Sequence, residues 1–143
     1  MTDISPSGVA SAGSVVPDAA LVSYTHWMYA LHALSAAMGV FSAATVVGTF
    51  IFGIPSIVAV VMNYVRRSDA RGTYLQSHFT WQLRTFWFAV LWFLLAGLFS
   101  LPLLLLFGLG IVTWILAAFV VGVWIVYRVA RGWLRLKDGM PVG

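Results

Sequence analysis

The sequence predicts an all-α, polytopic membrane protein of four transmembrane helices, with both termini in the cytoplasm. Three observations predict this class. Hydrophobic residues make up 62% of the 143 positions. Charged residues make up only 8%, whereas about a quarter of the residues in soluble domains are charged. All eight Lys and Arg residues fall in two short clusters, 66–84 and 128–137, each beside a long apolar run.

The N-terminal segment, residues 1–22, is rich in Ser, Gly, Ala, Val and Pro, and Asp3 and Asp18 are its only charged residues. It has no basic start followed by a compact apolar core, so it does not have the pattern of a cleaved secretory signal. Its small apolar surface cannot offset the entropy lost on ordering. We therefore expect a disordered tail, followed by one transmembrane domain over residues 23–143.

The first long apolar run, residues 25–65, contains no charged residue. As one helix it would be ~60 Å long, which is twice the ~30 Å thickness of a bilayer core. Glycine and proline residues between positions 48 and 55 weaken helix propagation there. The run is therefore predicted to form helices at about 25–47 and 51–66, of which the second is barely long enough to span.

The second uncharged run, residues 85–127, is divided by the same length argument. Its Ser, Pro and Gly residues gather between positions 100 and 110. A turn in this stretch predicts the third helix at about 77–100 and the fourth at about 105–129.

The distribution of charge predicts the orientation. Every Lys and Arg lies between the second and third helices, just inside the third, or at the C-terminal end, and the two opposite turns carry no charge. Four spans put both basic segments on one side, which the positive-inside rule identifies as the cytoplasm. A basic nucleic-acid-binding face would require a soluble module, so no nucleic-acid partner is expected. We expect anionic headgroups to be bound by Arg66, Arg67, Arg71, Arg128, Arg131, Arg135 and Lys137.

Polar residues within the helices are the candidate interaction sites. They are costly in a bilayer unless they are partnered, so they should meet one another inside the bundle or face the headgroups. Arg84, about two turns into the third helix, either extends to phosphate level or marks a functional polar site. The candidates are His32, Asn63, His78, Gln82, Arg84 and Thr85.

No catalytic constellation is present in the sequence. Cysteine is absent, no Asp or Glu lies in a predicted span, and neither GxSxG nor HExxH occurs. We therefore expect no enzymatic activity, no cofactor and no metal site. Two alternatives stay open: an oligomeric pore or carrier with a path lined by polar residues such as His32 and Arg84, and a haem-binding redox subunit with His26 and His78 as axial ligands.

Two blocks carry a family resemblance: TYLQSHFTWQLRTFWFAVLW, after a basic turn, and YRVARGWLRLKDGMPV, near the C-terminus. Together with the His of YALHALS, they resemble a family of small uncharacterised bacterial inner-membrane proteins, grouped with the Tic-twenty-type component of the chloroplast inner-envelope import machinery. The resemblance covers about 25–142 and implies four helices in a bacterial inner membrane. The matching positions are His32, His78, Trp81, Gln82, Arg84, Thr85, Arg131, Gly132, Trp133 and Pro141.

The resemblance implies roles in structure or interaction for these positions. Together with the absence of a reactive set, it makes a non-enzymatic accessory or interaction subunit the leading hypothesis. The expected partners are anionic lipids, a second copy of the chain, or another membrane protein.

Overall fold

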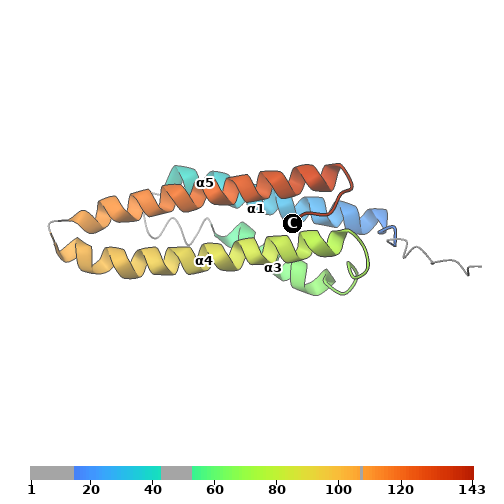
Figure 1. Cartoon of the computed structure of the whole chain (residues 1–143), viewed down its shortest axis with the longest axis horizontal. Helices are drawn as coiled ribbons and strands as arrows, with labels where there is room; N and C mark the ends of the chain where they lie inside the picture. Colours follow the sequence, from blue (N-terminus) through green and yellow to red (C-terminus); the bar gives the residue numbers. More distant parts are fainter. Residues whose placement is uncertain (1–14, 43–52, 107) are drawn as a thin grey trace, which may run out of the picture.

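The computed structural model of the chain describes residues 15–42, 53–106 and 108–143, without the side chains of residues 40–42. In these ranges the chain forms four helices and no strand, which confirms the all-α class. The helices are α1 (Ala19–Ser42), α3 (Ile54–Arg66), α4 (Leu75–Leu105) and α5 (Leu109–Lys137), as Figure 1 shows.

The helices follow one another around the bundle. α1 packs against α3 and α5, α4 packs against α3 and α5, and the contact between α4 and α5 is the most extensive. The start of α1, the connection from α3 to α4 and the end of α5 all lie at one end of the molecule, and α4 and α5 extend beyond α3 at the other (Figure 1). We call the first the basic end, residues 15–32, 59–86 and 121–143. We call the part of α4 and α5 beyond it, residues 91–105 and 109–120, the outer hairpin.

α1 begins earlier than the sequence predicted, at Ala19 instead of about residue 25, so residues 19–22 are not part of the tail. Asp18 explains the earlier start. Its side chain accepts a hydrogen bond from the backbone N–H of Ala20 at 3.2 Å, and its carbonyl accepts from Leu21 and Val22, as expected of an N-terminal capping residue. The predicted end of this helix, 43–47, and most of the predicted turn, 48–52, lie outside the described residues, as do tail residues 1–14.

α3 begins at Ile54, slightly later than predicted, with Pro55 in its first turn. Proline suits this position because the N–H that it lacks has no acceptor in the first turn of a helix. The helix has 13 residues, which gives it a length of ~20 Å. As described, it is shorter than a bilayer core.

α4 and α5 are both longer than predicted, and the break between them lies at residues 106–108. Pro102 lies inside α4, where only the last turn follows it, so the hydrogen bond that it removes interrupts little of the helix. Gly108 makes the turn with φ of +74°, a conformation that glycine adopts readily. α5 continues to Lys137 because Gly139 and Met140 close it with backbone bonds to Leu136 and Arg135, the pairing of a Schellman cap.

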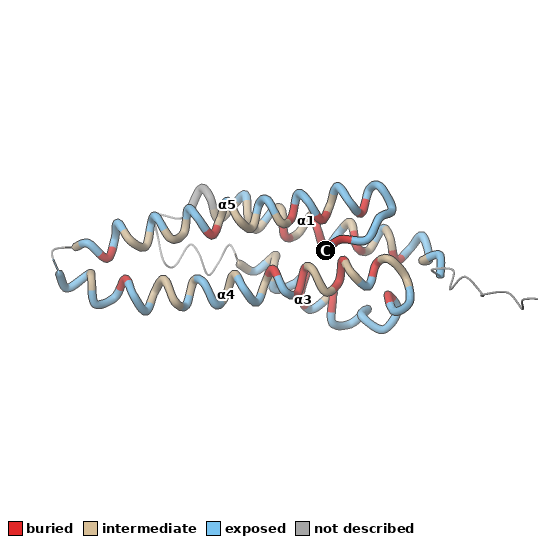
Figure 2. Tube along the Cα trace, viewed as in Figure 1, coloured by how far each residue is buried: buried red, intermediate tan, exposed pale blue. Residues whose placement is uncertain are grey.

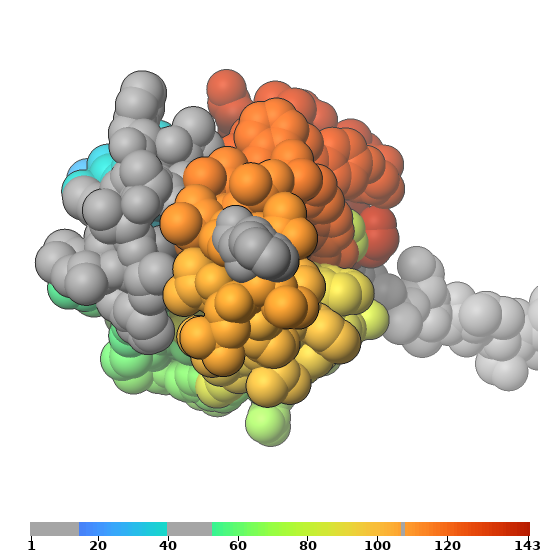
Figure 3. All heavy atoms as spheres, turned by 90° about the vertical axis from the view of Figure 1, so that its left-hand side faces the viewer, coloured from blue at the N-terminus to red at the C-terminus, as the bar shows by residue number. Residues whose placement is uncertain are grey.

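Burial divides the molecule along its length (Figure 2). The apolar core lies at the basic end and contains Leu21, Met28, Tyr29, Ala59, Ala70, Leu75, Phe79, Val129 and Leu136. In α4 and α5, only 11% of the residues in the most apolar 18-residue stretch of each helix are buried. Figure 3 views the molecule from the hairpin end, where the residues coloured orange project toward the viewer.

Two helices of the described chain, α4 and α5, are long and apolar enough to cross a membrane. They contain 31 and 29 residues and are ~45 Å long, against ~30 Å for a hydrocarbon core. Each therefore has room for an apolar span together with a polar segment at the basic end.

Candidate functional site

His78 is fully buried at the centre of the basic end. Its Nε2 atom lies 2.8 Å from the backbone carbonyl oxygen of Met140, and its Nδ1 atom lies 2.9 Å from the hydroxyl oxygen of Tyr29. A carbonyl oxygen only accepts, so Nε2 carries the proton and Nδ1 of the neutral ring accepts from Tyr29. One imidazole therefore joins α1, α4 and the C-terminal tail.

The C-terminal tail, residues 138–143, folds back against α4. The backbone N–H of Val142 donates to Ser77 Oγ at 3.0 Å, and the Val142 side chain is buried. Together with the bond from His78 to Met140, this fixes the tail over the start of α4. The tail is therefore part of the packed basic end.

Tyr29 reaches His78 because α5 has glycine at position 132. A Cβ atom there would collide with the hydroxyl and ring of Tyr29. Since Tyr29 is fully buried and held by His78, its ring cannot easily move aside. Gly132 thus provides the space for the contact between α1 and α5.

Asn63 joins α3 to α4 from a fully buried position. Its amide nitrogen donates to the carbonyl of Phe79 at 3.0 Å and to Gln82 Oε1 at 3.3 Å. The other amide atoms, Asn63 Oδ1 and Gln82 Nε2, have no partner within the described parts of the chain. An unpaired buried polar group typically costs about 1–3 kcal/mol, so these two atoms mark places where water or another polar group would be favoured.

A small cavity of about 50 Å³ lies between the four helices next to Gln82. A single water needs roughly 10–15 Å³ by this measure, so there is room for a few. Two of its lining side chains, His32 and Gln82, are more than nine-tenths buried, and each has a ring or amide Nε2 atom without a partner among the described residues. The Nδ1 atom of His32 pairs with Ser56 Oγ at 3.0 Å. The cavity is lined by Tyr29, His32, Ser56, Trp81, Gln82, Thr85, Phe86, Ala89, Ile125, Arg128 and Val129.

Arg128 closes one side of the cavity. Its guanidinium carbon lies 3.6 Å from the centroid of the Trp81 ring, and its Nε donates to Thr85 Oγ1 at 2.7 Å. The indole N–H of Trp81 in turn donates to the backbone carbonyl of Arg128 at 3.0 Å. These reciprocal contacts hold Arg128 inward, although the sequence placed it among the headgroup-binding residues; its binding to headgroups stays a prediction.

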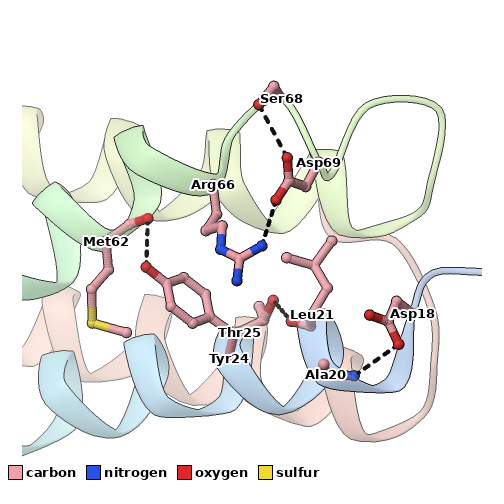
Figure 4. Close-up of polar contacts among 9 residues, drawn as sticks. All are labelled: Asp18, Ala20, Leu21, Tyr24, Thr25, Met62, Arg66, Ser68 and Asp69. Carbon is pink, nitrogen blue, oxygen red and sulfur yellow. Dashed lines mark hydrogen bonds and ion pairs between the residues drawn. The ribbon is translucent and has the colours of Figure 1, made fainter.

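The other predicted headgroup-binding residues lie on the surface of the basic end and are exposed. Arg66 pairs with Asp69 at 2.8 Å, beside Tyr24, whose hydroxyl donates to the carbonyl of Met62 (Figure 4). Arg131 donates to the Tyr127 hydroxyl and to the carbonyl of Gly143. The remaining members are Arg67, Arg71, Arg135 and Lys137.

The six candidate polar residues are not all brought together. Asn63 meets Gln82, and both His32 and Thr85 border the cavity that Gln82 lines. His78 instead forms its own junction with Tyr29 and the C-terminal tail. Arg84 is exposed and lies outside both clusters.

The histidines proposed as alternative haem ligands are both engaged. His26 Nδ1 accepts from the indole N–H of Trp133 at 2.9 Å, and both ring nitrogens of His78 are bonded. An axial ligand must offer a free ring nitrogen, so haem binding through His78 requires breaking one of its bonds. Within the described ranges, no three His, Asp or Glu side chains come together in a way that could hold a metal ion.

Three functional positions were missed by reasoning from individual residues. Tyr29 and Ser56 supply the partners of His78 and His32, and the carbonyl of Met140 comes from a tail beyond the last predicted helix. Spacing could have suggested one of them, because Tyr29 lies one turn before His32 in α1. Nothing in the local sequence indicates that residues 138–143 fold back.

No protein-family model, curated protein or solved structure matches this chain. The arrangement must therefore be interpreted from its own geometry. It offers hydrogen-bonding groups around a small cavity, and a cation held against an aromatic ring.

Proposed function

We propose that this chain is a multi-pass protein of the bacterial inner membrane that acts as a non-enzymatic interaction subunit. In this proposal all four helices cross the bilayer, and the basic end with both termini lies in the cytoplasm. We also propose that the chain is a member of the small four-helix family that the sequence resembles.

The observation that carries the proposal is the contrast between the two ends. At the basic end, side chains from all four helices bond to one another, and the backbone of the C-terminal tail bonds to α4. The outer hairpin instead exposes large apolar side chains on both of its helices, such as Phe99 at 67% and Phe119 at 68%. Apolar surface of this extent is normally covered by lipid or by another protein.

A partner helix can approach α5 closely at Gly122. No described atom lies within 4 Å of where its Cβ would be. Phe119 lies one turn earlier on the same face. A small residue beside an exposed aromatic ring suits the packing of a second membrane helix, because transmembrane helices associate through close backbone approach.

Site-specific photo-crosslinking in native membranes tests this proposal. A photoreactive residue at Phe119 should give a crosslinked protein adduct, either a dimer of this chain or a complex with one partner. The matched control is Leu134, which is similarly exposed but lies at the basic end, and it should give none. Adducts to lipid alone at Phe119, with monomeric protein throughout, would overturn the proposal.

The four-span part of the proposal has a separate test. Since the chain has no cysteine, a single Thr49→Cys substitution, in the turn predicted from sequence and outside the described residues, can be probed with an impermeant maleimide. Labelling from the periplasmic side supports four spans. Labelling from the cytoplasmic side would leave only α4 and α5 as spans.

A second candidate function is an oligomeric pore or carrier component. The observation that favours it is the small cavity between the four helices, where nitrogens of His32 and Gln82 have no partner among the described residues. Proteoliposomes would then take up water or small polar solutes faster than protein-free vesicles, and His32→Phe, which fills the cavity, would remove the difference. Equal rates for wild type, variant and empty vesicles would eliminate this candidate.

A further inference from the structure

A groove runs along the outer face of α3 and α4, from the basic end to the start of the outer hairpin, and is separate from the cavity between the four helices. Its volume is about 440 Å³, which lies within the range of clefts that bind small molecules and cofactors. We call it the α3–α4 groove. It is lined by Tyr64, Arg67, Thr80, Leu83, Arg84, Trp87, Phe88 and Leu91.

Two arginines make one part of the groove cationic. Arg67 follows the end of α3, and Arg84 lies nine residues after the start of α4. Both are exposed, and among the described residues neither pairs with a carboxylate, because the single salt bridge found there joins Arg66 to Asp69. The groove therefore presents two uncompensated guanidinium groups, which suit bidentate contacts to phosphate oxygens.

The other part of the groove is apolar and exposed. Trp87, Phe88 and Leu91 are each between 42% and 54% exposed. They lie three, four and seven residues after Arg84, so they continue its face of α4 away from the basic end. The indole N–H of Trp87 donates to the Tyr64 hydroxyl at 3.2 Å, which links α3 to α4 across the groove.

This order of groups matches the order of groups in a phospholipid. Arg67 lies where α3 ends, Arg84 lies farther along the groove in α4, and the apolar surface follows beyond Arg84 in the direction of the bilayer interior. Arg84 begins ~14 Å into α4 by the rise of the helix. Its long side chain can extend back toward headgroup depth while its methylenes remain on the apolar surface.

We propose that the α3–α4 groove is a binding site for an anionic phospholipid of the cytoplasmic leaflet. Arg67 and Arg84 bind the phosphate, and an acyl chain lies along Trp87, Phe88 and Leu91. A free phosphate would leave the apolar part uncovered, and an acidic protein segment would have to enter the hydrocarbon layer to reach it. This inference rests on the proposed membrane placement of the basic end.

Lipid retention by the purified full-length protein tests the site. The protein in mild detergent is titrated with phosphatidylglycerol or phosphatidylcholine, and bound lipid is counted by native mass spectrometry. The Arg67→Gln/Arg84→Gln variant should bind phosphatidylglycerol about 30-fold more weakly, because the loss of each guanidinium weakens binding by a factor of roughly five. The Arg71→Gln/Lys137→Gln variant removes the same charge from exposed positions that were also expected to bind headgroups but do not line the groove, and it should weaken binding by less than about threefold.

A third variant and a soluble competitor distinguish lipid from free phosphate. Phe88→Ala should weaken phosphatidylglycerol binding about tenfold, and glycerol 3-phosphate should displace the lipid poorly. Unchanged melting temperatures show that the variants are folded.

Three results would overturn the inference: equal loss in both double variants, no loss in either, or full displacement by glycerol phosphate with Phe88→Ala unchanged. Each is independent of the crosslinking at Phe119. A failure of the lipid site is therefore distinguishable from a failure of the interaction function.

Discussion

The basic end and the outer hairpin are held together in different ways. At the basic end, His78, Asn63 and Arg128 each join separate segments through side-chain hydrogen bonds. In the outer hairpin, α4 and α5 meet where Gly110 approaches the backbone of Ser100 and Leu104, and one side-chain hydrogen bond of the described residues, between Ser100 and Thr113 at 3.1 Å, joins the two helices there. Polar networks specify one arrangement of the helices, whereas apolar helix pairs depend on close approach of the backbones. At the basic end, polar contacts therefore join the helices to one another, whereas the outer hairpin leaves much of its apolar surface exposed.

The largest expected effect comes from breaking the outer hairpin at Gly110. A Cβ there would overlap the Ser100 carbonyl oxygen and the backbone of Leu104, which cannot rotate away. We expect Gly110→Ala to cost about 3 kcal/mol, the upper range for overpacking, measured as loss of thermal stability in detergent. Gly97→Ala is the matched control in the same hairpin: its Cβ would make only an ordinary contact of 3.6 Å with the Trp114 ring, so it should be neutral or slightly stabilising. Equal losses in both variants would contradict the assigned contact.

The next largest effect concerns the central junction of the basic end. Tyr29→Phe removes the hydroxyl that donates to His78 Nδ1 and leaves that buried atom unpaired. We expect a loss of about 1–3 kcal/mol, seen as a lower melting temperature. Tyr24→Phe removes a hydroxyl bonded only to a backbone carbonyl in a less buried place and should cost less. A larger loss for Tyr24→Phe than for Tyr29→Phe would show that His78 does not join the segments of the basic end.

A smaller effect tests the inward placement of Arg128. Lysine keeps the charge but loses the planar stacking on Trp81 and cannot reproduce the Nε bond to Thr85. Arg128→Lys should therefore lower stability by about 1 kcal/mol. Arg135→Lys, at an exposed site on the same helix, serves as the control. If the two substitutions have the same effect, Arg128 faces the headgroups as the sequence suggested.

The smallest effect is expected at the exposed ion pair. Hydrogen bonds from Arg66 and then Ser68 hold the pKa of the Asp69 carboxyl below its usual value. Because the pKa of this carboxyl is lower in the folded state than in the unfolded state, where it is about 3.9, ionised Asp69 stabilises the folded state. This stabilisation is fully present above about pH 3.9 and is lost only as the pH falls through the folded-state pKa. The Asp69 side chain is exposed, so Asp69→Asn should leave the melting temperature unchanged between pH 5 and 7. A clear loss of melting temperature would show that the pair of Arg66 and Asp69 contributes to the stability of the basic end.

The sequence was sufficient to predict the helices because apolar run length is a strong signal. It predicted four helices, and the structure confirms four in the described residues. It was less successful at the breaks. Pro102 and Ser100 were expected near the turn but lie inside α4, because the turn is made by Gly108 with its positive φ. A proline near the end of a helix removes little, so its presence does not locate the break.

The candidate site was predictable only in part. Polar side chains are unfavourable in a bilayer unless they have partners, and this reasoning identified His32, Asn63, His78 and Gln82. The structure buries all four. Their partners were not predictable, because those partners come from distant segments, such as the Met140 carbonyl 62 residues beyond His78. The family resemblance includes Gly132 but assigns it no contact, so the approach of Tyr29 was not predicted, and Gly122 on the same helix contacts nothing described. Close approach is a property of the packed bundle.

The most direct test of the difference between the basic end and the outer hairpin is to measure which side of the membrane each one faces. Ser68→Cys and Leu106→Cys place single thiols in exposed connections at the basic end and at the tip of the outer hairpin of a chain without cysteine. An impermeant maleimide is applied to right-side-out and inverted vesicles of each variant. It should label the Ser68→Cys variant only from the cytoplasmic face and the Leu106→Cys variant only from the periplasmic face. Labelling of both variants from the same face would contradict the account.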